Sequence, residues 1–174
     1  MSNSWPPMLK RGLQITASSV AALEARLGTK LPEDYAEFLR DVNGGQTAPS
    51  HRLFTIRFRN GRTDDTALSS LYSLDDTDDR RDLVTSWERT RAWLPAEVLQ
   101  VGYDGFGGAV VVVIAGPRRG QVWFLDGIEE RPEGSNPRVE WFDRRQVAKV
   151  ADSFREFMQG LRPFEEAHHR NAGV

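Results

Sequence analysis

The stretch LPEDYAEFLRDVNGG, residues 31–45, carries the clearest structural signal in the sequence. Pro32 suits the first position of a helix, where its missing N–H is not needed, and Glu33 and Asp34 place negative charge at the positive end of the helix dipole. The apolar side chains recur on one helical face, at Tyr35, Phe38, Leu39 and Val42. The closing Asn-Gly-Gly tolerates positive φ. The stretch therefore predicts an amphipathic helix that needs an apolar surface to cover.

Three further segments have helical spacing. Residues 15–28 predict a helix that Thr16 caps with its side chain and Gly28 ends in the left-handed conformation. Another helix is expected to begin at Asp82, whose side chain would cap it. Residues 147–161 carry apolar side chains at helical spacing and are predicted to form one closing helix, which stops before Pro163.

The remaining apolar runs read as strands. Residues 53–58 alternate with a period of two, and residues 69–74 give a weaker strand signal. Residues 98–102 and 109–116 flank the glycine-rich YDGFGG, which we interpret as a tight β-turn, and a hairpin is expected across residues 116–120. In the predicted strands 122–125 and 139–142 both alternating sets are apolar. These strands are therefore covered on both faces, or one face is an apolar binding patch.

These elements do not alternate as βαβα, so we predict an α+β fold. The expected architecture is a single domain: a mostly antiparallel mixed sheet with two N-terminal helices, one inserted helix and a C-terminal helix packed on it. A chain of 174 residues has room for one core. We place the domain at residues 13–162, with flexible termini at 1–12 and 163–174.

Composition excludes several classes of protein. The chain has no cysteine, which rules out disulfides and thiolate metal sites and fits the cytoplasm. Its longest apolar run, residues 109–115, is far below the ~20 residues of a membrane span. A net charge of -2 argues against a nucleic-acid partner. Residues 64–82 nevertheless hold seven aspartates against Arg80 and Arg81, which makes this segment strongly acidic.

No motif supports catalysis, a metal or a cofactor. The glycine cluster at residues 102–108 precedes a strand rather than a helix, so it does not form a phosphate loop. The DDTDD run lacks the glycine and glutamate positions of an EF-hand. The histidines lie in a loop and in the tail, at His51, His168 and His169. No nucleophile has a partner base in any recognisable motif. The tryptophans are interpreted as core rather than as a ligand platform, at Trp87, Trp93, Trp123 and Trp141.

Several motifs in order resemble the SUKH superfamily, the Smi/Knr-type domain. Its pattern has an E-x-x-L-G stretch, L-P-x-x-Y/F-x-x-F/L with N-G, an I/V-G-x-D-G-x-G loop, G-x-V-Y/W and a closing S-F-x-x-F helix. These correspond here to residues 24–28, 31–44, 101–107, 120–123 and 153–157, so the resemblance covers about residues 15–162. One position departs from the pattern: the family often has Asp after G-x-G, whereas this chain has Gly108.

The resemblance implies an α+β domain without catalysis that binds another protein. In the bacterial branch such domains are immunity proteins that neutralise a cognate toxin, often a nuclease; fungal members are scaffolds that regulate cell-wall synthesis. Both hypotheses stay open, and a small hydrolase or ligand-binding enzyme is the least favoured. The residues expected to contact the partner lie in the acidic loop, in the glycine-rich turn and on the following strand: Asp75, Asp76, Asp78, Asp79, Tyr103, Asp104, Phe106 and Trp123.

Overall fold

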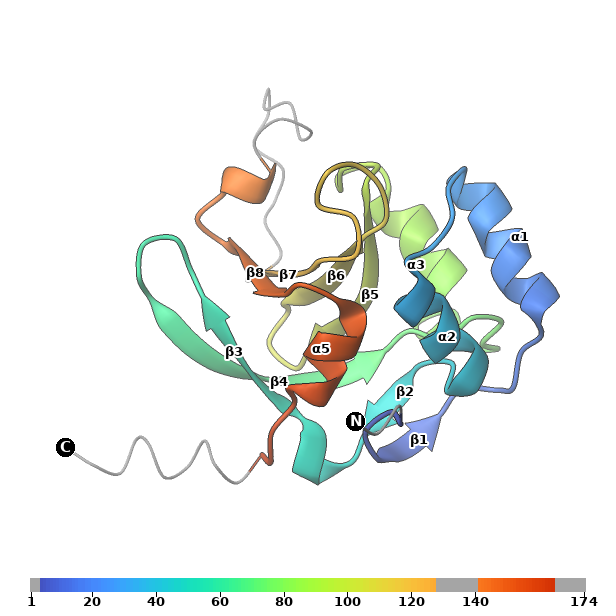
Figure 1. Ribbon diagram of the computed structural model, residues 1–174, viewed down its shortest axis with the longest axis horizontal. Helices are drawn as coiled ribbons and strands as arrows, with labels where there is room; N and C mark the ends of the chain where they lie inside the picture. The colour runs from blue at the N-terminus through green and yellow to red at the C-terminus, as the bar shows by residue number, and fades with distance from the viewer. Residues whose placement is uncertain (1–3, 128–140, 165–174) are drawn as a thin grey trace.

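The computed structural model describes residues 4–127 and 141–164 (Figure 1). The strands are β1 (Met8–Arg11), β2 (Gly45–Thr47), β3 (Leu53–Arg57), β4 (Thr63–Leu71), β5 (Val98–Asp104), β6 (Ala109–Val113), β7 (Val122–Leu125) and β8 (Val147–Ala151). The helices are α1 (Ala17–Leu27), α2 (Glu33–Asp41), α3 (Leu83–Thr90) and α5 (Phe154–Gln159), with short 3-10 turns at Pro49–His51 and Trp141–Asp143. The α+β prediction is confirmed.

The described strands form one eight-stranded sheet in the order β1-β2-β4-β5-β6-β7-β8, with β3 paired to β4. Each of these strand pairs is antiparallel. The hairpin predicted across residues 116–120 joins β6 to β7, and Gly116 and Gly120 both have positive φ there. The glycine-rich turn joins β5 to β6, also as predicted.

The larger core lies between the sheet and the helices. In Figure 1, α2 and α5 lie in front of the strands, with α1 on the outer side of α2. The predicted stripe of α2 is buried: Phe38 and Leu39 are fully covered, and Phe38 packs against Phe154 of α5 with ring centroids 5.0 Å apart. From the sheet, Val110 and Val112 of β6 point into this core. We call this side the helix-covered face.

The opposite face of the sheet carries a second, smaller core. Val111 and Val113 of β6 and Leu125 of β7 point into it. Leu94, which follows α3, and the pair Trp141 and Phe142 cover these side chains. The two alternating apolar sets of β7 are therefore explained by coverage on both sides rather than by an exposed patch. We call this side the loop-covered face.

The β3–β4 hairpin also contributes to the larger core, through the buried side chains of Phe54, Ile56 and Phe58. Figure 1 shows it as a long curved arm. Salt bridges tie its tip to the rest of the sheet: Arg59 contacts Asp143 at 2.6 Å, and Arg62 contacts Asp126 at 2.5 Å. At its base, Leu53 exchanges backbone hydrogen bonds with Arg162. The sheet therefore curls around the core of the helix-covered face, and β3 contacts β8.

Three expectations in the N-terminal part of the chain were wrong. Residues 8–11 were expected in a flexible segment but form β1, which pairs with β2, and Trp5 is held by a hydrogen bond from its indole Nε1 to Asp41 at 3.1 Å. Thr16 precedes α1 but gives it no side-chain cap, because its hydroxyl is hydrogen-bonded to Ser18 instead. Gly28 ends α1 at φ 70° as predicted. Pro32 stands one residue before α2 rather than inside it.

The helix predicted over residues 147–161 was also wrong in its first half. Residues 147–151 form β8, which pairs with β7, and only Phe154–Gln159 are helical. Pairing with β7 holds residues 147–151 as a strand, and Ser153, whose hydroxyl accepts a hydrogen bond from the Glu156 amide, marks the start of the helix. In the strand predicted at 139–142, Trp141 and Phe142 lie in a 3-10 turn; residues 139 and 140 lie outside the described residues.

The strand predicted at residues 69–74 is shifted. The strand β4 begins at Thr63 and ends at Leu71, so Asp64 and Asp65 belong to the sheet and not to a loop. Of the tryptophans expected in the core, Trp141 is fully buried, whereas Trp87, Trp93 and Trp123 are only partly buried. In the described part of the chain, no helix has the length and apolarity to cross a bilayer.

Candidate functional site

The eight predicted contact residues fall into three places. Asp75, Asp76, Asp78 and Asp79 lie in the loop between β4 and α3, which we call the acidic loop (residues 75–82). Tyr103 and Asp104 end β5, and Phe106 lies in the β5–β6 turn. Trp123 lies on β7, and its ring packs edge-on against Phe142 with centroids 4.9 Å apart.

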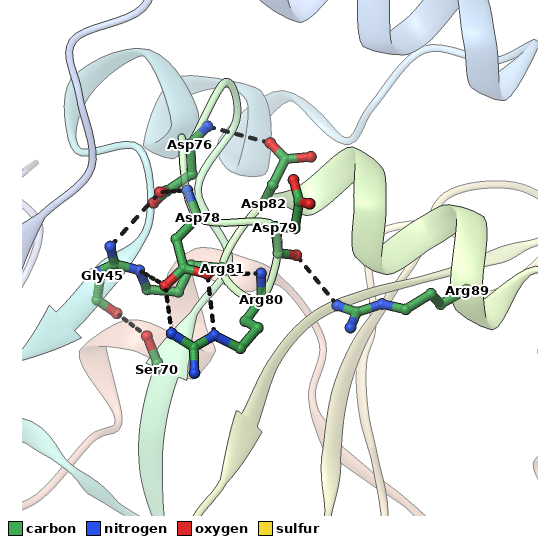
Figure 2. Close-up of polar contacts among 9 residues, drawn as sticks. All are labelled: Gly45, Ser70, Asp76, Asp78, Asp79, Arg80, Arg81, Asp82 and Arg89. Atoms are coloured by element: carbon green, nitrogen blue, oxygen red, sulfur yellow. Dashed lines mark hydrogen bonds and ion pairs between the residues drawn. The ribbon is translucent and has the colours of Figure 1, made fainter.

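The acidic loop is held in shape by its own aspartates (Figure 2). Asp76 accepts a hydrogen bond from the Asp78 amide at 2.9 Å, and Asp82 accepts one from the Asp76 amide at 3.2 Å. Asp82 also caps α3 through the Thr85 amide at 2.8 Å, as the sequence predicts. These carboxylates accept hydrogen bonds from backbone amides of the loop and of α3, so they hold the loop backbone in one shape.

Two arginines neutralise much of the charge in this loop. Figure 2 shows Arg80 and Arg81 turned toward Asp78. Arg80 donates from Nε and Nη2 to the two carboxylate oxygens at 3.2 Å each, and this contact holds the pKa of Asp78 below its ordinary value. Arg81 also lies 3.8 Å from Asp76.

The acidic segment predicted from the sequence, residues 64–82, is therefore not a surface of uncompensated negative charge. Outside the loop, Asp65 is paired with Arg162 at 2.9 Å. Asp75 and Asp79 are exposed and make no ion pair with any residue that the structure describes. Asp82 also has no ion pair among these residues, but it is buried, so the exposed and unpaired negative charge of the loop lies on Asp75 and Asp79.

Asp104 organises the β5–β6 turn from inside. Its Oδ1 accepts hydrogen bonds from the amides of Phe106 and Gly108 at 2.9 and 2.7 Å, and its Oδ2 accepts one from the Thr66 hydroxyl at 2.7 Å. The residue is only 6% exposed. Its carboxylate therefore holds the turn, and a flat partner surface cannot reach it; only a group inserted beside the turn could contact it.

This turn displays Phe106 and requires glycine at 108. Phe106 is 84% exposed, more than any other large apolar side chain among the described residues. At Gly108, a Cβ atom would lie 2.1 Å from Cζ of Phe124. The Asp that related sequences often carry there would need Phe124 to move. The departure noted in the sequence thus has a packing cause.

The acidic loop and the β5–β6 turn meet at Tyr103. The Tyr103 ring lies 5.5 Å from the ring of Tyr72, the residue that follows β4, and the Arg80 guanidinium lies within electrostatic reach of its hydroxyl. Burial raises the pKa of Tyr72 above its ordinary value. The structure therefore brings together Tyr103, Asp104 and Phe106 in one turn, whereas Asp78 is linked to them only through its ion pair with Arg80.

Two other predicted residues, Asp75 and Trp123, lie apart from this group. Asp75 lines a depression against α1, beside Ser18 and Arg26. Trp123 has its indole Nε1 hydrogen-bonded to Gln121 at 3.0 Å, and Phe142 packs on its ring. Neither belongs to the surface around Tyr103.

A hollow of about 290 Å³ opens beside Tyr103 on the loop-covered face. The sequence analysis did not identify three of its lining residues, Tyr72, Trp93 and Gln100, as site residues. A signal existed for one of them, because Gln100 is the only polar residue in the apolar run VLQV at residues 98–101. Tyr72 and Trp93 follow different elements, and only the folded chain brings them to this place.

The described residues contain no group of three or more histidine, cysteine, aspartate or glutamate side chains that could hold a metal ion. What the surface around Tyr103 does offer is an exposed ring, an ordered turn and a hollow with aromatic walls. These are features of molecular recognition.

Comparison with known proteins agrees with the order of motifs in the chain. The family model described as SMI1 / KNR4 family (SUKH-1) matches residues 14–160, most of the chain. A search of curated proteins finds no match. The matched region runs from just before α1 through α5 and contains all the residues of the surface around Tyr103. The chain therefore belongs to the SMI1/KNR4 (SUKH-1) family.

Proposed function

We propose that this domain is a non-catalytic binding protein, and specifically an immunity protein that neutralises a cognate toxin by direct contact in the cytoplasm. The observation that carries the proposal is the β5–β6 turn, which Asp104 holds from inside and which displays the ring of Phe106 to solvent; the ordered acidic loop is a second exposed feature. An exposed aromatic ring on a fixed backbone is typical of the residues that dominate protein interfaces.

The rigidity of this face favours tight binding. The loop is already ordered by the hydrogen bonds from the amides of Asp76 and Asp78, and the turn by those to Asp104. A surface that is ordered before contact loses less conformational entropy on binding. An inhibitor that must capture a toxin quickly benefits from such preorganisation.

The remaining charge favours a basic partner. Asp75 and Asp79 are exposed and unpaired within the described residues. A nuclease toxin must present positive charge to bind phosphate. Two free carboxylates would steer such a partner toward the loop and speed the encounter at low ionic strength. A nuclease is therefore the toxin class that best matches the charge of the acidic loop.

The test is co-expression with the product of the adjacent gene. We expect that product to kill cells when it is expressed alone, this chain to rescue them, and the two proteins to co-purify. Co-purification without toxicity would support the second role that the family resemblance implies, a scaffold or regulator of a host protein. Turnover of a small molecule by the purified chain would contradict both.

The structure also sharpens the test of the charges. Substitution of Asp76 or Asp78 by lysine would remove hydrogen bonds that order the loop. The informative protein is therefore the double variant Asp75→Lys, Asp79→Lys. We expect slower association with the toxin at low salt, by about tenfold, and little change in its dissociation. The matched control is Asp64→Lys, an exposed aspartate on β4 outside the loop. Equal slowing by the control would remove the loop from the proposal.

A further inference from the structure

The hollow beside Tyr103 has a definite structural cause. Tyr103, Ala109 and Leu125 form one cross-strand row on β5, β6 and β7. The middle residue of this row is an alanine, so the side chains on both sides of it leave a space on the loop-covered face. That space, about 290 Å³, is lined by these three residues and by Tyr72, Trp93 and Gln100.

Aromatic rings line the hollow. The rings of Tyr72 and Tyr103 stand 5.5 Å apart at an interplanar angle of 46°. Trp93, which follows α3, supplies a third ring. The face of an aromatic ring carries negative charge density, and several such faces around one space favour a positively charged group.

The polar atoms of the hollow include two acceptors. Gln100 is 9% exposed, and its Nε2 donates to the Tyr72 hydroxyl at 3.4 Å and to the Gly102 carbonyl at 3.3 Å. Because a carbonyl accepts only from a donor, this contact fixes the orientation of the amide. Both of these bonds use Nε2, so Oε1 remains as an acceptor that receives no hydrogen bond from any described residue.

The second acceptor is the carboxylate of Asp104, which also lines the hollow. Its Oδ2 accepts one hydrogen bond, from Thr66, and a carboxylate oxygen can accept two. A ligand that brought only apolar atoms would bury both acceptors without donors, which is unfavourable. A ligand with a flat, charged group that donates hydrogen bonds satisfies the rings and the acceptors together.

We propose that this hollow binds the side chain of an arginine on the protein partner, an assignment that rests on the proposed protein-binding function. The planar guanidinium stacks on aromatic rings and donates in its own plane, which a lysine ammonium does not do. Basic surfaces that bind phosphate are rich in such side chains. Phe106, on the turn that borders the hollow, would pack against the partner beside the inserted arginine.

Two described arginines, Arg80 and Arg89, are hydrogen-bonded to groups of the acidic loop and not to the lining of the hollow. Arg80, near the Tyr103 hydroxyl, is paired with Asp78 through Nε and Nη2. Arg89 donates to the backbone carbonyl of Asp79 at 3.4 Å. Arg80 still adds positive charge at the rim, so its removal should strengthen the binding of a cation. The variant Arg80→Ala therefore provides a test in the opposite direction.

The experiment is an NMR titration of the full chain with three blocked tripeptides that differ only in the central residue: Gly-Arg-Gly, Gly-Lys-Gly and Gly-Leu-Gly. We expect the arginine peptide to give saturable shifts of the Trp93 indole and of the Gly107 and Gly108 amides, at an affinity about fivefold above the other two. Equal or tighter binding of the leucine peptide would overturn the proposal, as would the absence of shifts at millimolar peptide.

Variants of the hollow complete the design. Gln100→Leu removes the free acceptor and should lower the affinity for the arginine peptide about fivefold. Ala109→Leu fills the space and should abolish binding, with Asp64→Asn as the surface control that changes nothing. Spectra of the distant core confirm that each variant is folded. If the peptide fails to bind while the chain still neutralises a toxin, only the arginine assignment falls; peptide binding without toxin capture would contradict the immunity role instead.

Discussion

The two faces of the sheet are built from the same strands but are covered in different ways. On β6, Val110 and Val112 point toward the helices, and Val111 and Val113 point toward the loops; all four are fully buried. Helices cover one face with apolar stripes at regular spacing. Short segments cover the other face with separate anchors such as Leu94 and Trp141.

This difference separates stability from recognition. A helical stripe fills the space above a sheet continuously, so truncation there leaves a cavity that the neighbours fill only in part. Loop coverage is discontinuous and leaves the hollow above Ala109. We therefore expect the helix-covered face to set the free energy of unfolding, and the loop-covered face with its neighbouring turn to set what the domain binds.

The strongest test of this division is Phe154→Ala on the helix-covered face. Phe154 is fully buried, and its ring lies 4.8 Å from that of Tyr35 and 5.0 Å from that of Phe38. Its truncation should lower the free energy of unfolding by about 3–5 kcal/mol, measured by urea denaturation. The control is Phe106→Ala on the β5–β6 turn, which should change it by less than about 0.5 kcal/mol. Similar losses in both variants would break the comparison.

A smaller effect is expected at the turn itself. Asp104→Asn keeps the shape of the side chain but removes the charge that strengthens the hydrogen bonds from the Phe106 and Gly108 amides, and it places a donor at Thr66, whose hydroxyl must then accept instead. We expect a loss of about 1–3 kcal/mol in the free energy of unfolding, with the change in NMR shifts concentrated at Gly107 and Gly108. Asp79→Asn in the acidic loop is the matched control and should be neutral. A neutral result for Asp104 would mean that the turn holds its shape without the carboxylate.

Much of the fold could be predicted because local signals agreed with the final structure. The stripe of α2, the stop at Gly28 and the hairpin glycines each follow from one stretch of chain. Residues 147–151 could not be assigned in this way. Val147, Val150 and Ala151 fit a helical face, and Val147 and Ala151 also share one side of a strand, so the outcome depends on pairing with β7.

The candidate site was less predictable for a similar reason. Phe106 could be identified in the glycine-rich turn, but the buried role of Asp104 depends on Thr66, a residue from another strand. The hollow joins Tyr72, Trp93 and Gln100, which follow or lie in three different elements. No spacing along the chain brings them together, so the sequence could suggest a binding surface near Tyr103 but not its shape.

The cap of α3 gives a third, smaller test. This helix connects the acidic loop to Trp93, so it supports the loop-covered face from its edge. Asp82→Ala removes the cap bond to Thr85 and should cost about 1–2 kcal/mol in the free energy of unfolding. Thr16→Ala at the start of α1 is the matched control, because Thr16 makes no cap bond, and it should cost only a few tenths of a kcal/mol. An equal loss of stability in the two variants would mean that the hydrogen bond from the Thr85 amide to Asp82 does not stabilise α3.

The smallest effect at neutral pH is expected for Tyr35→Phe on the helix-covered face. The Tyr35 hydroxyl is buried and has no hydrogen-bond partner among the described residues. Removal of an unsatisfied buried group should leave the free energy of unfolding unchanged or raise it by up to about 1 kcal/mol. The aromatic packing against Phe154 is retained, and the family pattern accepts Tyr or Phe at this position. A large loss would reveal a hydrogen bond to the hydroxyl and so a polar element in this core.

The same variant has a distinct signature in alkaline solution. Burial raises the pKa of Tyr35 above its ordinary value, so the folded state keeps the proton that the unfolded state loses above about pH 10. The stability due to this proton is complete below pH 10 and declines as the pH rises further. Urea unfolding at pH 8 and pH 11 should therefore show that wild type loses up to ~1.4 kcal/mol per pH unit more than Tyr35→Phe above pH 10. Parallel losses in the two proteins would mean that Tyr35 ionises in the folded state, and that the helix-covered face admits water as the loop-covered face does.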